Sequence, residues 1–155
     1  MKSELTQINL ALAWLWILLG FVSGMVLGMF FRGESWLGGY ASFKRRMYRL
    51  GHISFFGLGA VNLLFCFTVQ NFALSSELVH FASLAFVTGA IAMPLCCLVM
   101  AHFPRAHMIF AVPVISLIAG GLMMLALIAH DSKAAGAAST ASSPENHPSL
   151  TINTP

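Results

Sequence analysis

Charged residues are scarce in this sequence. Lys, Arg, Asp and Glu account for 8% of the 155 residues, whereas hydrophobic residues account for 58%. Soluble domains usually carry about 25% charged and about 45–50% apolar residues. So few charges cannot coat the surface of a water-soluble globule, and a net charge of +3 gives no strong basic surface for nucleic acid. The composition therefore predicts an integral membrane protein whose main contact is the lipid bilayer.

Acidic residues are absent from every long apolar stretch. The chain contains four uncharged segments, residues 5–31, 50–76, 78–104 and 106–130, and all five Asp and Glu residues lie outside them. Without a buried acid, general acid–base pairs and Ser-His-Asp arrangements have no support. The same absence argues against proton-coupled or sodium-coupled transport, which typically uses carboxylates inside the membrane. We therefore expect that the protein is not an enzyme.

Each uncharged segment is long enough to cross a bilayer as a helix. The segments run to roughly 25 residues, and about 20 suffice for a hydrocarbon core of about 30 Å. The alternating pattern of barrel strands is missing. The sequence thus predicts an all-α integral membrane protein, a four-helix bundle in residues 1–130 with spans at about 8–31, 51–70, 78–100 and 108–129. Residues 131–155 are rich in Ala, Ser, Thr and Pro and are expected to form a disordered tail.

The distribution of basic residues predicts the orientation. All Lys and Arg residues except Lys2 and Lys133 lie in residues 32–50 and 101–107. Basic loops stay in the cytoplasm, so these two loops are expected there and both termini outside, in a multi-pass protein of the cell (inner) membrane. Cleavage of the first span as a signal peptide is not expected, because its apolar run is too long for the core of such a peptide.

The loop between the first two spans has its own helical pattern. Aromatic and apolar residues recur at steps of three and four from Trp36 to Leu50. The basic residues that share this loop with them are Lys44, Arg45, Arg46 and Arg49. Aromatic anchors beside cations predict a short interfacial helix at about residues 40–50 that contacts anionic headgroups. The helix could also continue into the second span, and an acidic partner would require the same pattern.

Three glycines recur every fourth residue in the first span, at Gly20, Gly24 and Gly28. Such spacing opens a groove in which another helix can approach closely. The partner helix could belong to this chain, to a second copy or to another membrane subunit, and the sequence leaves these three alternatives open.

Polar residues within the second span share one helical face. His52, Asn62 and Gln70 fall within about 80° of one another at 100° per residue. Polar groups avoid hydrocarbon, so this face should meet protein or water. We expect Asn62 to bond a neighbouring helix; the alternative is that it lines a path for a small solute.

Two residue sets could hold a metal or cofactor. His52, His102 and His107 map to the cytoplasmic ends of spans, where imidazoles on facing helices could ligate haem b or a metal. Interfacial histidines are also common without any ligand. Met93, Cys96 and Met100 lie within about 60° on one helix face and are soft ligands that suit Cu(I). Such stripes more often fill a core, so we expect no cofactor, with haem b as the alternative.

These patterns favour one function and leave two alternatives. The expected function is an accessory or assembly subunit, non-enzymatic, that packs against other membrane subunits or itself within a larger complex such as a respiratory one. The first alternative is an electron carrier that binds haem b or a metal through the cytoplasmic histidines. The second is a small-solute channel or carrier lined by Asn62.

Overall fold

The computed structural model describes residues 2–72 and 77–141, and these ranges contain helices and no strand. In chain order the elements are α1 (Lys2–Phe30), the 3-10 helix η1 (Trp36–Gly38), α2 (Phe43–Asn71), α3 (Glu77–His102), the 3-10 helix η2 (Pro104–Phe110) and α4 (Ala111–Ala141). The all-α prediction is therefore confirmed.

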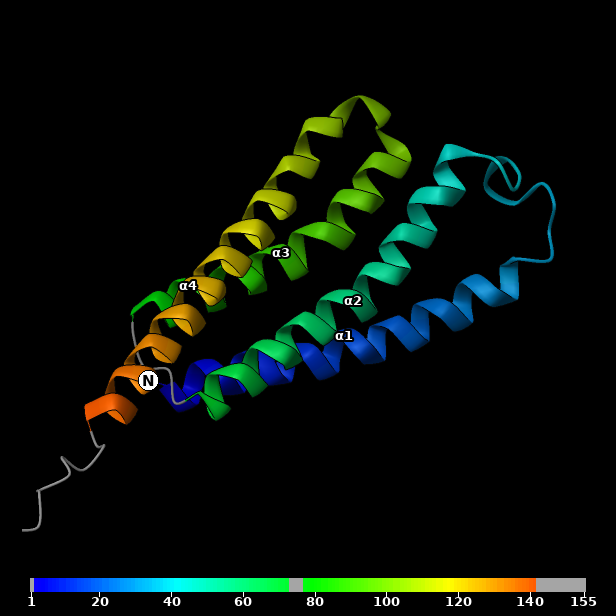
Figure 1. Ribbon diagram of the computed structural model, residues 1–155. Coiled ribbons are helices and arrows are strands. Elements are labelled where there is room, and N and C mark those ends of the chain that lie inside the picture. The colour runs from blue at the N-terminus through cyan, green and yellow to red at the C-terminus, as the bar shows by residue number, and fades with distance from the viewer. Residues whose placement is uncertain (1, 73–76, 142–155) are drawn as a thin grey trace, which may run out of the picture.

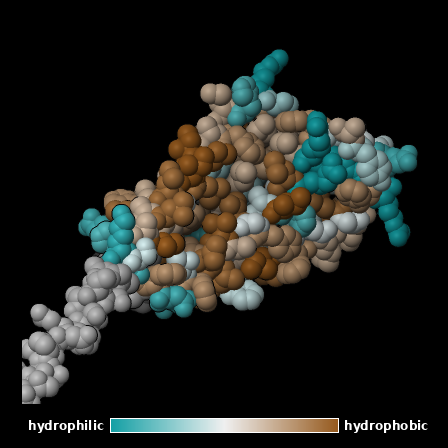
Figure 2. Space-filling model, in the orientation of Figure 1, coloured by the Kyte–Doolittle hydropathy of each residue, from teal (hydrophilic) through white to brown (hydrophobic). Residues whose placement is uncertain are grey.

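Four segments are long and apolar enough to cross a membrane: Thr6–Phe30, Phe43–Asn71, Glu77–His102 and Pro104–Lys133. At 1.5 Å per residue the shortest still exceeds a hydrocarbon core of about 30 Å. On the face shown in Figure 2, hydrophobic residues cover the middle of the molecule and most hydrophilic ones lie toward its ends. By length and composition, these four segments are therefore candidate membrane spans.

The helices pack mainly in chain order. α1 contacts α2, α2 contacts α3 and α3 contacts α4, and α1 also contacts α3 to a lesser extent. Figure 1 shows the α1–α2 pair and the α3–α4 pair close together near the N-terminus and spread apart toward the end that holds η1 and η2. The two halves of the bundle therefore lie closer together near the N-terminus than at the end that holds η1 and η2.

Side-chain hydrogen bonds join α1 to α3 across the closed part of the bundle. The amide of Asn9 donates to the hydroxyl of Ser83, and both side chains are buried. The indole Nε1 of Trp16 donates to the carbonyl oxygen of Ala90 at 2.9 Å. Polar side chains that pair in this way can stabilise helix association where lipid supplies no hydrophobic drive.

Glycines lie where consecutive helices approach most closely. A Cβ on Gly59 would lie 3.1 Å from the carbonyl oxygen of Ala13, one on Gly51 3.3 Å from Cβ of Cys97, and one on Gly89 2.5 Å from the side chain of Leu117. These three contacts belong in turn to the α1–α2, α2–α3 and α3–α4 interfaces. Small residues thus set the spacing of every consecutive pair.

The expected short interfacial helix is not a separate element. α2 begins at Phe43 and continues without a break through residue 50 to Asn71. Its start is capped by Ser42, whose side-chain oxygen accepts a hydrogen bond from the backbone N–H of Arg45 at 3.2 Å. Since no proline follows the cap, nothing separates the basic segment from the span, and residues 43–50 form the first turns of α2.

The fourth helix is longer than expected. The sequence predicts that the ordered domain ends at His130, whereas α4 continues to Ala141. Residues 131–141 contain five alanines. Because alanine is the best helix former, this stretch continues α4. The rest of the predicted tail, residues 142–155, lies outside the described ranges.

Candidate functional site

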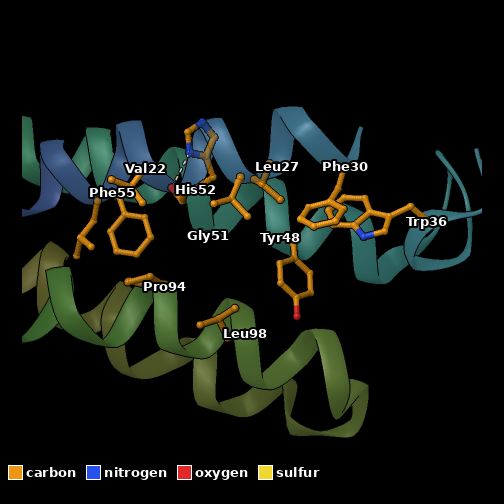
Figure 3. A pocket seen from close by; sticks show the side chains of 13 residues that line it. Val22, Leu27, Phe30, Trp36, Tyr48, Gly51, His52, Phe55, Pro94 and Leu98 are labelled. Atoms are coloured by element: carbon orange, nitrogen blue, oxygen red, sulfur yellow. Dashed lines mark hydrogen bonds between the residues drawn. The ribbon is translucent and has the colours of Figure 1, made fainter. Parts of the chain in front are cut away.

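A cavity of about 460 Å³ lies between α1, α2 and α3, at the end of the bundle where the helix pairs spread apart. Figure 3 shows side chains from all three helices and from η1 facing this space. One wall is a single face of α1 from Leu19 to Phe30, and the opposite wall includes Pro94 and Leu98 of α3. No residue that lines the cavity is Lys, Arg, Asp or Glu, so the space is uncharged.

A serine and a histidine form the polar part of the α1–α2 wall. Ser23 Oγ lies 2.9 Å from Nδ1 of His52 and 3.1 Å from the carbonyl oxygen of Gly20. A hydroxyl has one hydrogen; if it is donated to the Gly20 carbonyl, Oγ must accept from the Nδ1–H of His52. The imidazole is then held in the tautomer that leaves Nε2 without a proton.

Aromatic residues occupy the end of the cavity nearest η1. The rings of Phe30 and Trp36 are stacked, with centroids 5.8 Å apart and planes 12° apart. Tyr48 lies on α2, and its hydroxyl is 3.1 Å from Nε2 of His102 on α3. This hydrogen bond links α2 to α3 at the open end of the bundle. The cavity therefore has an aromatic end with a hydroxyl and a purely apolar end.

Arg45 lies beside this end and is completely buried. Its guanidinium carbon is 4.2 Å from the ring centre of Phe31 and 3.9 Å from that of Tyr40. Nη2 donates to the carbonyl oxygen of Phe31 at 3.0 Å, whereas Nε and Nη1 have no hydrogen-bond partner in the described part of the chain. The residue holds the α1–α2 connection against α2 through cation–π contacts.

The burial of Arg45 differs from the expectation for the basic loop, which predicts headgroup contacts for Trp36 and for all four cations. Trp36 is half-buried and stacked on Phe30. Residues 31–40 fold back over the face of α2 that carries Arg45 and exclude it from headgroups. Arg46 is exposed, and Lys44 and Arg49 are half-buried.

The glycine groove of α1 is filled for two-thirds of its length by the same chain. A Cβ on Gly20 would lie 2.8 Å from the ring of Phe56, and one on Gly24 would lie 2.7 Å from Cε1 of His52. Gly28 has no such neighbour within 4 Å. The sequence left three possible partner helices open. α2 of this chain packs against Gly20 and Gly24, and Gly28 faces open space.

Asn62 is fully buried, but the hydrogen bond of its amide stays within α2. Nδ2 donates to the carbonyl oxygen of Leu58 at 2.9 Å, and Oδ1 has no partner among the residues that the structure describes. The interhelical bond expected of Asn62 is instead made by Asn9 and Ser83, which the sequence patterns did not single out. Gln70 is exposed near the end of α2.

The three candidate histidines lie in different surroundings. Within residues 2–72 and 77–141, no group of three or more His, Cys, Asp and Glu side chains is placed to hold a metal ion. His102 is bonded to Tyr48, and His107 is exposed on η2.

The sulfur stripe of α3 packs against its neighbours. The thiol of Cys96 donates to the carbonyl oxygen of Ile109 at 3.4 Å. Met93 packs against the cluster of Trp16, Leu58 and Ala90, and Met100 is buried.

The sequence patterns missed Ser23 and Tyr48 as lining residues. Ser23 lies beside the glycine repeat, which is the one signal that could have identified it, and no sequence signal distinguishes Tyr48 from the other aromatic residues of its segment.

The fold and the cavity define an all-helical protein with four candidate membrane spans and an uncharged space between the first three. Comparison with known protein families, curated proteins and solved structures finds no match.

Proposed function

We propose that this is a small, non-enzymatic, multi-pass protein of the inner membrane that acts as an accessory or assembly subunit of a larger membrane complex, such as a respiratory one. The observation that carries the proposal is the open position at Gly28. The glycine groove of α1 continues beyond the part that α2 fills, so a second helix from another subunit has a place to dock.

The surface around Gly28 fits such a helix. Met25 and Met29 flank it and are 62% and 64% exposed. Only 17% of the most apolar stretch of α1 is buried within the chain, the same share as in the fourth span, against 39% in α2. Small residues beside flexible methionines allow close helix approach and adaptable packing. These features support a helix of another subunit as the partner, with the lipid bilayer around the remaining surface.

The orientation belongs to the same proposal. The segments that hold most of the basic residues, the start of α2 and η2, lie at the same end of the molecule (Figure 1). Positively charged loops stay in the cytoplasm. We therefore propose that this end faces the cytoplasm and that both termini face outward.

Site-specific photo-crosslinking in native membranes tests the docking surface. We expect a photoreactive amino acid at Met29 to yield an adduct with another membrane protein, and the same group at Leu122 of α4, 62% exposed, to yield none with that protein. Gly28→Leu should abolish the Met29 adduct. Adducts with lipid alone would refute the proposal. An adduct with a second copy of this chain would show that the partner is this protein itself and not a foreign subunit.

A haem b or metal-binding electron carrier is the second candidate, because of how Ser23 orients His52. Ligand histidines usually bond one ring nitrogen to a polar neighbour and leave the other for the metal, which is the arrangement inferred for Nδ1 and Nε2 here. The visible spectrum of protein purified in mild detergent tests it. A Soret band that disappears in His52→Ala would establish this function, and a colourless, metal-free protein would remove it.

A further inference from the structure

We propose that the cavity between α1, α2 and α3 binds an uncharged amphiphile of the quinone class, a planar ring with carbonyl or hydroxyl groups and an apolar tail. The inference goes beyond the proposed function and does not depend on it, because the cavity and the Gly28 surface are separate and only the cavity is concerned here.

The size of the cavity suits a small molecule better than a protein segment. Its volume of about 460 Å³ falls within the range of about 300–1,000 Å³ that is typical of small-molecule sites. A helix with side chains is about 10–12 Å across, so even two turns of one exceed the volume of this cavity. A molecule already dissolved in the bilayer can reach the space where the helix pairs spread apart.

The lining excludes a charged head. None of the residues around the cavity carries a formal charge as Lys, Arg, Asp or Glu. An ionised group in such a setting would lose its hydration without gaining a partner, at a cost of several kcal/mol. The guanidinium of Arg45 is enclosed by Phe31 and Tyr40 and does not line the space. Phosphate and carboxylate heads therefore do not fit.

The polar and aromatic groups favour a ring with oxygen substituents. Tyr48 and His52 both line the cavity from α2, and Figure 3 shows their side chains pointing in opposite directions. His52 is bonded to Ser23 of α1, and the hydroxyl of Tyr48 is bonded to His102 of α3. The Tyr48 hydroxyl can donate to a carbonyl oxygen when it accepts from Nε2–H of His102, whereas the one hydrogen of Ser23 is donated to the Gly20 carbonyl. Phe30 and Trp36 provide flat apolar surface for ring packing. Only apolar side chains line the far end, near Leu19 and Pro94, where a tail would lie.

Tryptophan quenching measures this binding directly. The full chain is placed in nanodiscs of phosphatidylcholine, in a Trp14→Phe background because Trp14 is 62% exposed, and titrated with decylubiquinone. Trp36 lines the cavity, so we expect quenching that saturates. Linear quenching without saturation, as free partition into the bilayer gives, would overturn the proposal.

A matched pair of variants tests whether the ligand binds in this cavity. Leu98 lines the cavity, whereas Leu95 lies on the same helix, is 53% exposed and does not line it. Leu98→Phe fills part of the space and should weaken binding by about tenfold, while Leu95→Phe should leave it within about twofold of the parent. Equal affinities in the two variants would overturn the site. Circular dichroism melting confirms that both variants fold.

Removal of one hydroxyl group tests the chemical class. Tyr48→Phe should weaken binding by about fivefold, since one hydrogen bond contributes about 1 kcal/mol. Decylbenzene has a ring and tail without oxygen and should compete about tenfold less well than decylubiquinone. Equal competition by decylbenzene, or by oleate, would show a general apolar or acyl site and overturn the quinone class.

Discussion

The guanidinium of Arg45 lies 3.9 Å from the ring centre of Tyr40, and Tyr40 in turn donates a hydrogen bond to the carbonyl oxygen of Phe31 at 3.2 Å. Because Arg45 donates to the same carbonyl, this one backbone oxygen just after α1 accepts hydrogen bonds from both side chains. The connection between α1 and α2 is therefore held down by a buried cation between aromatic rings, without any acidic partner in the described contacts.

Replacement of Arg45 should loosen this connection. Arg45→Ala removes the cation–π contacts and the bond to Phe31, and we expect faster amide hydrogen exchange in residues 31–42 and a loss of about 1–3 kcal/mol in stability. Arg45→Lys should recover little, because an ammonium lacks the planar fork. Arg46→Ala, at an exposed position, is the control and should change neither quantity. Unchanged exchange in Arg45→Ala would show that the cation does not hold the connection.

The two ends of the glycine groove should respond differently to a larger side chain. Gly24→Leu drives a side chain into the ring of His52, 2.7 Å from the new Cβ, and should lower stability in detergent by about 1–3 kcal/mol. At Gly28 the new Cβ meets nothing within 4 Å, and Gly28→Leu should stay within about 0.5 kcal/mol of the parent. Thermal melting followed by circular dichroism compares them. Equal losses would mean that Gly28 is covered within the chain.

Asn9 and Ser83 should be energetically coupled. A double-mutant cycle with Asn9→Ala and Ser83→Ala isolates their interaction. We expect a coupling free energy of about 0.6 kcal/mol, with about 1.7 kcal/mol as the upper range for such bonds in membrane proteins. Reversible unfolding in mixed micelles provides the four values. Additive losses would indicate that the bond adds nothing to the α1–α3 contact.

The proposed orientation predicts which residues react from outside the cell. The native cysteines Cys66, Cys96 and Cys97 are buried, so a membrane-impermeant maleimide should report only on introduced thiols. On intact cells we expect labelling of Ser132→Cys and not of Ser35→Cys, since these exposed positions lie at opposite ends of the molecule. Both should react after the membrane is opened. The reverse pattern would place the basic segments outside.

Local sequence determined the helices themselves. Long uncharged runs predict four helices whatever their neighbours are, because a backbone in an apolar setting must satisfy its own hydrogen bonds. The spacing of Gly20 and Gly24 likewise predicts a close helix contact, and α2 supplies it. Periodicity within one helix is enough for these conclusions, since it depends only on 3.6 residues per turn.

Only the tertiary structure decided which face meets which neighbour. Arg45 and Arg46 are adjacent basic residues of one segment. Residues 31–40 fold back over Arg45 and bury it, whereas Arg46 is exposed. Gly28 repeats the spacing of Gly24 but has no neighbour, because no side chain of α2 comes within 4 Å of it. The cavity arises in the same way, from the divergence of two helix pairs. Contacts between helices depend on the relative position and rotation of those helices. The sequence of a single helix determines neither its position nor its rotation.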